Sequence, residues 1–292
     1  MIEQRPIFIG GLSHSGKTQL RIALEANPEL SLTRRTYLWD RFYGRFGDLH
    51  DPANLGRCLE ALCADEAVAQ LSPDPPAIRR EVAEGDPSYA RVFGAFHRQH
   101  AERLGKPRWG EQLGFVERFA DPIFAAYPSA RMIHMVRDPR SGSGGRRRRP
   151  GALGWETARW LSSASLATRN RRRYPDGYLV VRCEALAAEP EATVADVCAF
   201  LGEPMLPAVR DRLDQIRFEA GAETDEGSPD AAFVDRYAGR ALPAFGYPTG
   251  TARLSPRDRV AFQLLDRPIN RASMAAWRIF GDGSAVGAEV DA

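Results

Sequence analysis

The sequence predicts an α/β protein in which a parallel sheet is flanked by helices. Two apolar runs, residues 131–136 and 178–181, are typical of strands covered on both faces. A helical pattern over residues 155–173 lies between them, and a strand, helix, strand order implies a right-handed crossover and parallel strands. A third observation is a short strand over residues 6–10 that leads through a glycine-rich turn into a helix.

The other elements follow from periodicity and from residues that end helices. Pro28 helps to end the first helix, and a weak strand signal follows around residues 30–32. Residues 37–105 are then helix-rich and predict a helical insertion after the first strand and helix. Within that insertion we expect helices over residues 37–46, 54–71, 77–83 and 88–104.

The second half of the chain completes the expected order. A short strand is predicted around Trp109, a helix over residues 114–127, and a helix over residues 191–201 that Gly202 stops. Ser255 followed by Pro256 is a favoured helix beginning and predicts a C-terminal helix. We expect one domain over residues 1–281 and a flexible, small and acidic tail over residues 282–292.

Composition argues against several classes of protein. A hydrophobic content of 43% with 27% charged residues is ordinary for a globular chain, and the apolar runs are too short to span a membrane. The charged residues 1–5 do not resemble a signal peptide, so a cytoplasmic location is expected. A net charge of +2 gives no general argument for nucleic-acid binding. The four cysteines lack zinc-ligand spacing and are expected to be buried small hydrophobic residues.

The run Arg146–Arg149 is the one place where local charge is extreme. A solvated loop is the favoured interpretation. The alternatives are a lid that pairs with ligand phosphate and a nucleic-acid patch, and no stacking aromatics interleave with the run to support the latter.

The turn after the first strand has the spacing GxxxxGKT over residues 11–18 and predicts a phosphate-binding loop. Its glycines let backbone N–H groups turn toward anionic oxygens, and the following helix adds its positive end. Lys17 supplies a mobile charge, and it is one of only two lysines among 40 basic residues, with Lys106. The expected ligand is diphosphate-like, and the expected contacts are Ser13, His14, Ser15, Gly16, Lys17 and Thr18.

A second segment, residues 132–140, delivers Arg137 at the carboxyl end of an apolar strand. Ligands of open α/β sheets bind at that edge. Arg137 is therefore expected to bind, in bidentate geometry, a second phosphate of the nucleotide held by the loop. A third segment follows in residues 178–186, 190–193 and 198–202.

Together these three segments resemble the sulfotransferases that use 3′-phosphoadenosine 5′-phosphosulfate (PAPS), in a form close to the tyrosylprotein-type and related bacterial enzymes. Residues 6–18 look like their 5′-phosphosulfate loop, and Val136-Arg-Asp-Pro-Arg140 looks like their 3′-phosphate segment. The resemblance covers about half of residues 5–202. It implies a P-loop-type α/β fold, a PAPS co-substrate, an acceptor hydroxyl and no required metal.

The loop departs from the family pattern in its charged residues. The family usually has Arg or Lys just before the Ser-Gly of its loop, and His14 occupies that place. The two threonines that normally follow are Lys17 and Thr18. Positive charge has thus moved along the loop.

The other two segments depart as well. The serine that the family uses for the 3′-phosphate falls at Gly145, and the expected substitutes are Ser141 and Ser143. Arg149 falls where the tyrosylprotein-type enzymes carry a further phosphate-binding arginine. Their catalytic glutamate maps near Arg35, so catalysis requires another carboxylate.

Sulfuryl transfer builds negative charge on the leaving phosphate. Lys17 and the loop amides would stabilise that charge, and His14 would donate a hydrogen bond or a proton. A carboxylate would take the acceptor proton, with Glu111 as the first candidate and Asp40 as the second. The alternative for each acid is a plain surface role, and for His14 it is a loop side chain that caps the helix or faces water.

Several other residues have structural interpretations. His134 is expected to be a satisfied core residue, and no histidine spacing supports a metal site. The aromatic stretch over residues 37–46 is expected to pack a helix against the sheet, with an acceptor pocket as the alternative.

Two further functions compete with sulfuryl transfer. A P-loop kinase would use ATP with magnesium, and Thr18 could bind that ion. The apolar strand, however, ends in Arg137 before Asp138, which suits an anion better than a metal. The other alternative is a non-catalytic nucleotide-binding module, since the family glutamate is missing.

Overall fold

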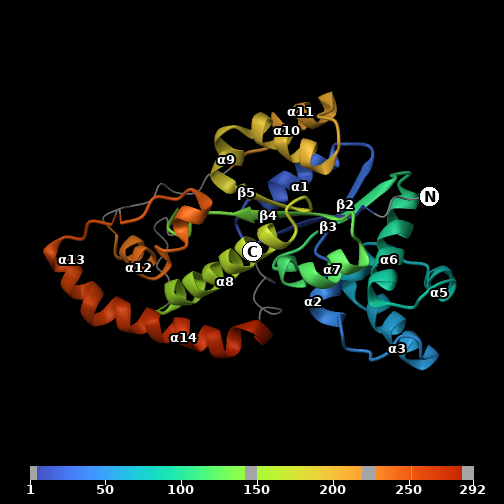
Figure 1. Ribbon diagram of the computed structural model, residues 1–292, viewed down its shortest axis with the longest axis horizontal. Helices are drawn as coiled ribbons and strands as arrows, with labels where there is room; N and C mark the ends of the chain where they lie inside the picture. Colours follow the sequence, from blue (N-terminus) through green and yellow to red (C-terminus); the bar gives the residue numbers. More distant parts are fainter. Residues whose placement is uncertain (1–4, 142–149, 219–227, 251, 285–292) are drawn as a thin grey trace.

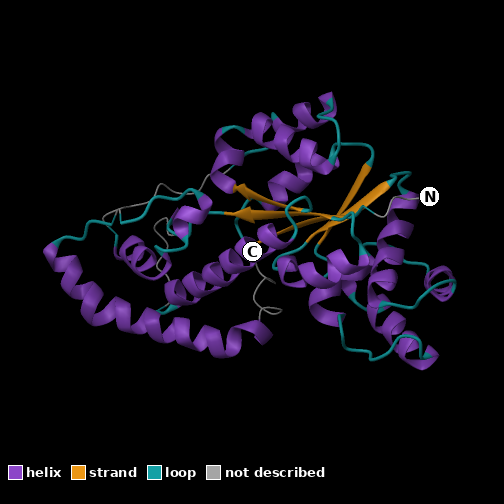
Figure 2. Ribbon diagram, in the orientation of Figure 1, coloured by secondary structure: helices purple, strands orange, loops and turns teal. Residues whose placement is uncertain are grey.

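The centre of the protein is a five-stranded parallel sheet in the order β2-β3-β1-β4-β5. The computed structural model describes residues 5–141, 150–218, 228–250 and 252–284. Figure 2 shows the strands crossing the middle of the molecule with helices on both sides. The strands are β1 (Ile7–Gly11), β2 (Leu30–Arg34), β3 (Arg108–Gln112), β4 (Arg131–Val136) and β5 (Tyr178–Arg182).

The position of β1 decides where the site forms. β1 is the middle strand, and all five of its residues are buried because helices cover both faces of the sheet. It pairs with β4 in a register that sets Gly11 opposite Met135. The segments that leave the two strands, the glycine-rich loop and the turn containing Arg137, therefore start side by side at one sheet edge.

Most helices in the first half lie in the segment between β2 and β3, where the insertion was expected. The helices up to β4 are α1 (Lys17–Glu25), α2 (Leu38–Phe42), α3 (Pro52–Cys63), α4 (Glu66–Ala69), α5 (Pro75–Ala83), α6 (Tyr89–Arg103), the 3₁₀ turn η1 (Val116–Phe119) and α7 (Ala120–Ala126).

The helices of the second half cover the sheet and extend beyond it. They are α8 (Ala152–Arg173), α9 (Cys183–Ala188), α10 (Pro190–Leu201), α11 (Pro207–Leu213), α12 (Pro229–Ala238), the 3₁₀ turn η3 (Leu242–Phe245), α13 (Pro256–Ala261), the π-helical turn η4 (Phe262–Asp266) and α14 (Arg267–Ser284).

The two faces of the sheet bury different helices. Ile7 and Ile9 of β1 pack with α1, α9, α10 and α11, whereas Phe8 points to the opposite face and packs with the α2–α7 segment. Figure 1 shows α9–α11 on one side of the sheet and α8 with α14 on the other. A third core joins α8, α12 and α14. Period-two alternation along β1 thus fixes which helices lie on which face.

The predicted parallel α/β fold is confirmed, with local differences. The expected helix over residues 54–71 is two helices, because the Asp65 carboxylate accepts a hydrogen bond from the Ala67 N–H and starts α4. The expected helix over residues 114–127 begins with the turn η1. The sequence interpretation omitted α9, α11 and α12, which are each ten residues or shorter.

The chain end differs from expectation in one detail. α14 continues to Ser284, and residues 285–292 of the predicted tail lie outside the described residues. Across the described ranges, no helix is both long and apolar enough to span a membrane.

Candidate nucleotide-binding site

The glycine-rich loop between β1 and α1 requires glycine at two positions. Gly11 has φ +112°, and a Cβ there would lie 2.1 Å from the carbonyl oxygen of Met135 in β4. Gly16 has φ +87° and precedes the first residue of α1. Both values are in the region that glycine adopts without steric cost. The loop therefore leaves β1 in close contact with β4 and turns directly into the N-terminus of α1.

The Lys17 side chain lies inside this loop. It is only 4% exposed, and its ammonium donates hydrogen bonds to the carbonyl oxygens of Gly11, at 2.8 Å, and Leu12. The Ser15 hydroxyl donates to the Leu12 carbonyl at 2.7 Å, while Thr18 is exposed. The loop thus holds a positive charge next to backbone amides that precede a helix N-terminus. This arrangement binds phosphate.

Arg137 reaches this loop from the end of β4. Its Nη1 donates to the His14 carbonyl oxygen at 3.0 Å, and its Nε donates to the Ser141 hydroxyl at 3.0 Å. The indole N–H of Trp160 in α8 donates to the Arg137 carbonyl at 2.9 Å. The sequence prediction that the arginine and the Lys17 loop face one cleft is confirmed.

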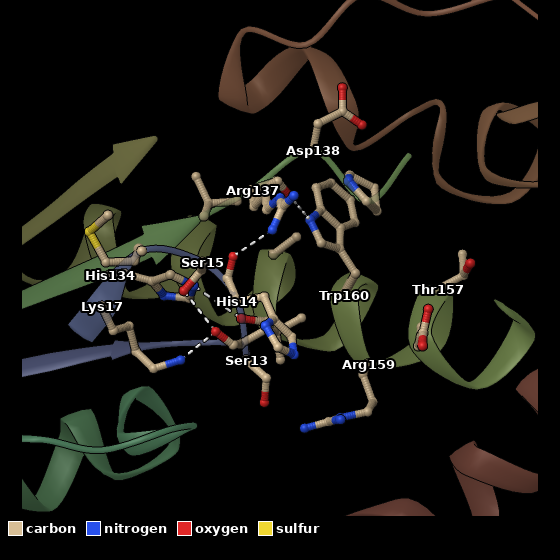
Figure 3. A pocket seen from close by; sticks show the side chains of 18 of the residues that line it. Ser13, His14, Ser15, Lys17, His134, Arg137, Asp138, Thr157, Arg159 and Trp160 are labelled. Atoms are coloured by element: carbon tan, nitrogen blue, oxygen red, sulfur yellow. Dashed lines mark hydrogen bonds between the residues drawn. The ribbon is translucent and has the colours of Figure 1, made fainter. Parts of the chain in front are cut away.

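A cavity of about 590 Å³ opens between this loop and α8. Figure 3 shows Ser13, His14 and Lys17 on its loop side, with Arg159 and Trp160 of α8 across from them. The cavity is lined by residues 12–19, Arg35, residues 134–139, Leu153, Glu156, Thr157, Arg159, Trp160, Ser163 and Ala164.

The turn after β4 is fixed by buried ion pairs. Arg140 is 4% exposed and pairs with Asp138 at 2.6 Å and with Asp235 of α12 at 3.0 Å. The Asp138 N–H donates to Glu184 Oε1 at 2.8 Å, and the Tyr247 hydroxyl donates to Glu184 Oε2 at 2.9 Å. The third sequence segment thus supplies a carboxylate that holds the turn next to Arg137.

A chain of four buried polar side chains lies beneath the loop. Glu117 Oε2 accepts the Gly11 N–H at 3.1 Å, and Glu117 Oε1 accepts the Ser163 hydroxyl at 3.0 Å. His134 Nε2 lies 3.0 Å from the Ser163 oxygen, and His134 Nδ1 lies 2.6 Å from the Tyr178 hydroxyl. All four side chains are buried.

Donor and acceptor counting fixes the proton positions in this chain. A carboxylate can only accept, so Ser163 gives its single proton to Glu117. His134 must then donate from Nε2 to Ser163, and in the neutral ring, which its lowered pKa favours, Nδ1 accepts the Tyr178 proton. Burial lowers the pKa of His134, as does the charge of Lys17, while Glu117 raises it. The prediction that His134 is a satisfied core residue is confirmed, although its ring also borders the cavity.

The two acids predicted as bases lie away from this cavity, and neither is among its lining residues. Asp40, in α2, forms a salt bridge of 2.8 Å with Arg118. Glu111, in β3, is fully buried, and its Oε1 accepts hydrogen bonds from the backbone N–H and the hydroxyl of Thr36. Their catalytic roles stay predictions. Arg35, at the position of the family glutamate, does line the cavity.

Glu111 faces a second buried group. His97 Nε2 lies 3.9 Å from Glu111 Oε2, and neither atom has a hydrogen-bond partner. Burial raises the pKa of Glu111 to about 7, opposed by the hydrogen bonds from Thr36, and burial lowers the pKa of His97 to about 3. Below about pH 7, a protonated acid therefore faces a neutral imidazole inside the core.

Other sequence expectations have clear positions. Trp39 packs among Tyr43, Tyr89, Phe93 and Phe119, which favours packing as the role of the aromatic stretch. The described cysteines are free thiols, three of them buried, and Cys63 is half-buried. No group of three His, Cys, Asp or Glu gathers in a metal-binding arrangement within the described ranges. Ser143, Arg149 and the rest of the Arg146–Arg149 run lie outside the described residues.

Sequence reasoning missed the contribution of α8 and of Glu117. The sequence pattern predicted a helix over residues 155–173, and in the structure Leu153, Thr157, Trp160 and Ala164, at spacings of three and four residues, form one face of α8. That pattern did not reveal that the face borders the loop. Glu117 carries no local motif, because its partner Gly11 is 106 residues away in the chain.

The comparisons with known proteins identify the class. The protein-family model of the sulfotransferase family matches residues 6–207, which is more than half of the 292 residues. The chain therefore belongs to the sulfotransferase family, and the family assignment does not favour the ATP-dependent kinase. A search of curated proteins gave no match.

The solved structures similar to this chain include sulfotransferases. The chain is 15% identical to the sulfotransferase domain from the curacin biosynthetic pathway, with a TM-score of 0.51 over 84% of this chain and 99% of that chain. The sulfotransferase domain of the Synechococcus PCC 7002 olefin synthase is 23% identical, with a TM-score of 0.48 over 74% of this chain and 82% of that chain. The Alicyclobacillus acidocaldarius sulfotransferase is 18% identical, with a TM-score of 0.45 over 84% of this chain and 97% of that chain. The similarity to the domain from the curacin pathway supports the sulfotransferase fold of this chain.

Glu117 supplies the first prediction. Glu117→Gln removes the negative charge and turns one of the two acceptor oxygens into an NH2 donor, so the Gly11 N–H loses its charge-assisted hydrogen bond. We expect affinity for adenosine 3′,5′-bisphosphate, measured by calorimetry, to fall about tenfold, since such bonds contribute about 1.5–3 kcal/mol. Hydrogen exchange at the Gly11 amide should rise locally, and the exposed Glu102→Gln variant should change neither quantity. Unchanged affinity and exchange in Glu117→Gln would remove it from loop positioning.

Glu111 gives a stability prediction. The folded state keeps a proton that the unfolded chain releases near its ordinary pKa of 4.5, so this stabilisation is fully present below pH 4.5 and is lost as pH rises through about 7. Relative to Glu111→Gln, the wild-type free energy of unfolding should fall with pH across that window, by at most about 1.4 kcal/mol per pH unit. Chemical denaturation at several pH values measures this difference. Parallel curves for the two proteins would contradict it.

Proposed function

We propose that the cavity binds PAPS and that the enzyme transfers its sulfuryl group to an acceptor hydroxyl. The observation that carries this is the contact between Arg137 and the His14 carbonyl, which sets two anion-binding groups on one cavity. The 5′-phosphosulfate would lie against the glycine-rich loop and the 3′-phosphate against Arg137. A cytoplasmic location and a metal-independent reaction stay predictions from the sequence.

The loop supports the 5′ end of the nucleotide. The Ser15 N–H donates to the Leu12 carbonyl at 3.3 Å, so the other amides of residues 13–18, at the N-terminus of α1, supply the donors, and Lys17 supplies the positive charge. Charge grows on the leaving phosphate as the bond to sulfur breaks, so a fixed ammonium stabilises the transition state more than the ground state. His14, whose exposed side chain is at the cavity wall, would assist with a hydrogen bond.

Arg137 and Ser141 support the 3′ end. Ser141 is buried, and its hydroxyl and carbonyl oxygens both accept hydrogen bonds from the Arg137 guanidinium. This contact orients the guanidinium plane, which can then present its remaining N–H groups to a phosphate in bidentate geometry. Of the two serines expected to replace the family's 3′-phosphate serine, Ser141 is the one within the described residues. Ser143 and Arg149 remain further predicted contacts.

The geometry favours Glu156 of α8 as the carboxylate that takes the acceptor proton. Of the described residues that line the cavity, the acids are Asp138 and Glu156. Asp138 is committed to Arg140 through both of its oxygens. Glu156 is exposed on the helix that lines the cavity opposite the loop.

Lys17 and Arg137 should separate catalysis from binding. Lys17→Ala should lower turnover at least about 100-fold and weaken adenosine 3′,5′-bisphosphate binding much less.

Arg137→Ala should weaken adenosine 3′,5′-bisphosphate binding about tenfold or more, yet leave the weaker binding of adenosine 5′-monophosphate unchanged, because that ligand has no 3′-phosphate. Calorimetry measures the affinities of both nucleotides, once in the presence of EDTA and once in the presence of magnesium.

Either of two results would contradict these assignments. Equal losses of turnover and affinity in Lys17→Ala would take Lys17 out of the chemistry. An Arg137→Ala variant that loses both ligands equally, or neither, would refute 3′-phosphate binding. Binding that appears only with magnesium would count against metal-independent PAPS recognition.

Three matched variants test the base. Glu156→Gln should lower transfer of radiolabelled sulfate from PAPS to a library of hydroxyl acceptors about 100-fold, with nucleotide affinity preserved. Glu111→Gln and Asp40→Asn should keep turnover within about threefold of wild type on the same acceptors. Wild-type turnover in Glu156→Gln, or its loss in Glu111→Gln at preserved stability, would move the base elsewhere.

A further inference from the structure

The helical segment from α13 to α14 exposes many large hydrophobic side chains: Val260 of α13, Leu264 and Leu265 of η4, and Ile269 and Ile279 of α14. Of the seven large hydrophobic residues that are exposed in the described part of the chain, five lie within residues 260–279. They include Leu264, Leu265, Ile269 and Ile279, which are between 46% and 73% exposed. Five exposed large apolar side chains within residues 260–279, unlike single ones scattered over a surface, indicate an interaction surface.

The opposite face of α14 is already used. Asn270 Oδ1 accepts the Gly154 N–H of α8 at 2.9 Å, and a Cβ on Gly154 would lie 1.9 Å from the Asn270 carbonyl oxygen. Trp277 packs edge-on against Trp155 of α8. Figure 1 shows α14 along the edge of the molecule, outside α8. The apolar outer face is therefore additional to the one that builds the core.

A row of arginines borders that face. Arg267, Arg271 and Arg278 of α14 and Arg236 of α12 line a hollow of about 740 Å³, together with Tyr237, Met274 and Ala275. None of these four arginines forms a salt bridge with an Asp or Glu in the part of the chain that the structure describes. Arg267 instead bonds to Tyr237 and Gln263. Four guanidinium groups around one hollow repel one another and attract an acidic partner.

We propose that the outer face of α14 docks an acidic amphipathic helix of a partner protein. Exposed Pro268, Ala272, Ala275 and Ile279 follow one another at spacings of four, three and four residues, which is the seam of a helix–helix contact. Arg271 and Arg278 stand one residue before Ala272 and Ile279, at the flanking positions where charge selects the partner.

Shape and charge distinguish this partner from the other possible occupants. The centre of the seam is small, with Ala272 and Ala275, which lets another helix approach closely but would insert little apolar area into a bilayer. In a symmetric contact through this segment, a second copy of the chain would bring a single carboxylate, the half-buried Asp266, because residues 263–279 contain no other acid. An acidic amphipathic helix can pack against the small residues of the seam and pair its carboxylates with the arginines.

Binding assays on the full chain test this surface. The probe is a fluorescein-labelled synthetic helix of about four heptads with leucine at the seam positions and glutamate at the flanking positions; a matched peptide carries lysine instead. Fluorescence anisotropy should detect binding of the glutamate peptide and little binding of the lysine peptide. The double variant Arg271→Glu, Arg278→Glu should lose at least about tenfold affinity for the former and gain affinity for the latter.

Further variants and probes keep the proposal falsifiable. Ile279→Ser should also weaken glutamate-peptide binding, whereas Arg57→Glu on the distant helix α3 should bind as wild type, and all should bind adenosine 3′,5′-bisphosphate normally. No peptide binding at about 100 μM, or equal binding by the double variant, would overturn the proposal. So would preferential binding to 3:1 phosphatidylcholine–phosphatidylglycerol vesicles, or dimers in sedimentation equilibrium that Ile279→Ser dissociates.

Discussion

The hydrogen bond from the Arg137 guanidinium to the carbonyl oxygen of His14 joins the two halves of the site. It exists because β1 and β4 are parallel neighbours, so that the turns leaving them start at the same sheet edge. One turn then offers amides, a lysine and a helix N-terminus, and the other offers an arginine. Everything proposed for the nucleotide depends on this single juxtaposition.

Buried and half-buried acids hold the two turns in place. Glu117 fixes the first amide of the loop, and Glu184 and Asp138 fix the turn that carries Arg137. Each of these carboxylates accepts at least two hydrogen bonds or ion-pair contacts, as buried charges must if they are not to cost several kcal/mol. The site therefore has a preformed frame in which carboxylates hold the backbone of the two turns that carry Lys17 and Arg137.

The chain order of strands and motifs was sufficient to predict the sheet and the meeting of Lys17 with Arg137, because strand ends in a parallel sheet must gather at one edge. It was not sufficient for Glu111. All five residues of β3 are buried, so no alternation of polar and apolar residues told which face its glutamate joins. Glu117 and the α8 residues belong to the site through contacts between segments far apart in the chain, and no local pattern records such contacts.

The most direct test is a crystal structure of the protein with adenosine 3′,5′-bisphosphate. Our account predicts the 5′-phosphate against the amides and ammonium of the Lys17 loop, the 3′-phosphate within hydrogen-bonding distance of Arg137, and the adenosine between them in the cavity beside Trp160. A 3′-phosphate bound away from Arg137, or a nucleotide bound outside this cavity, would contradict it.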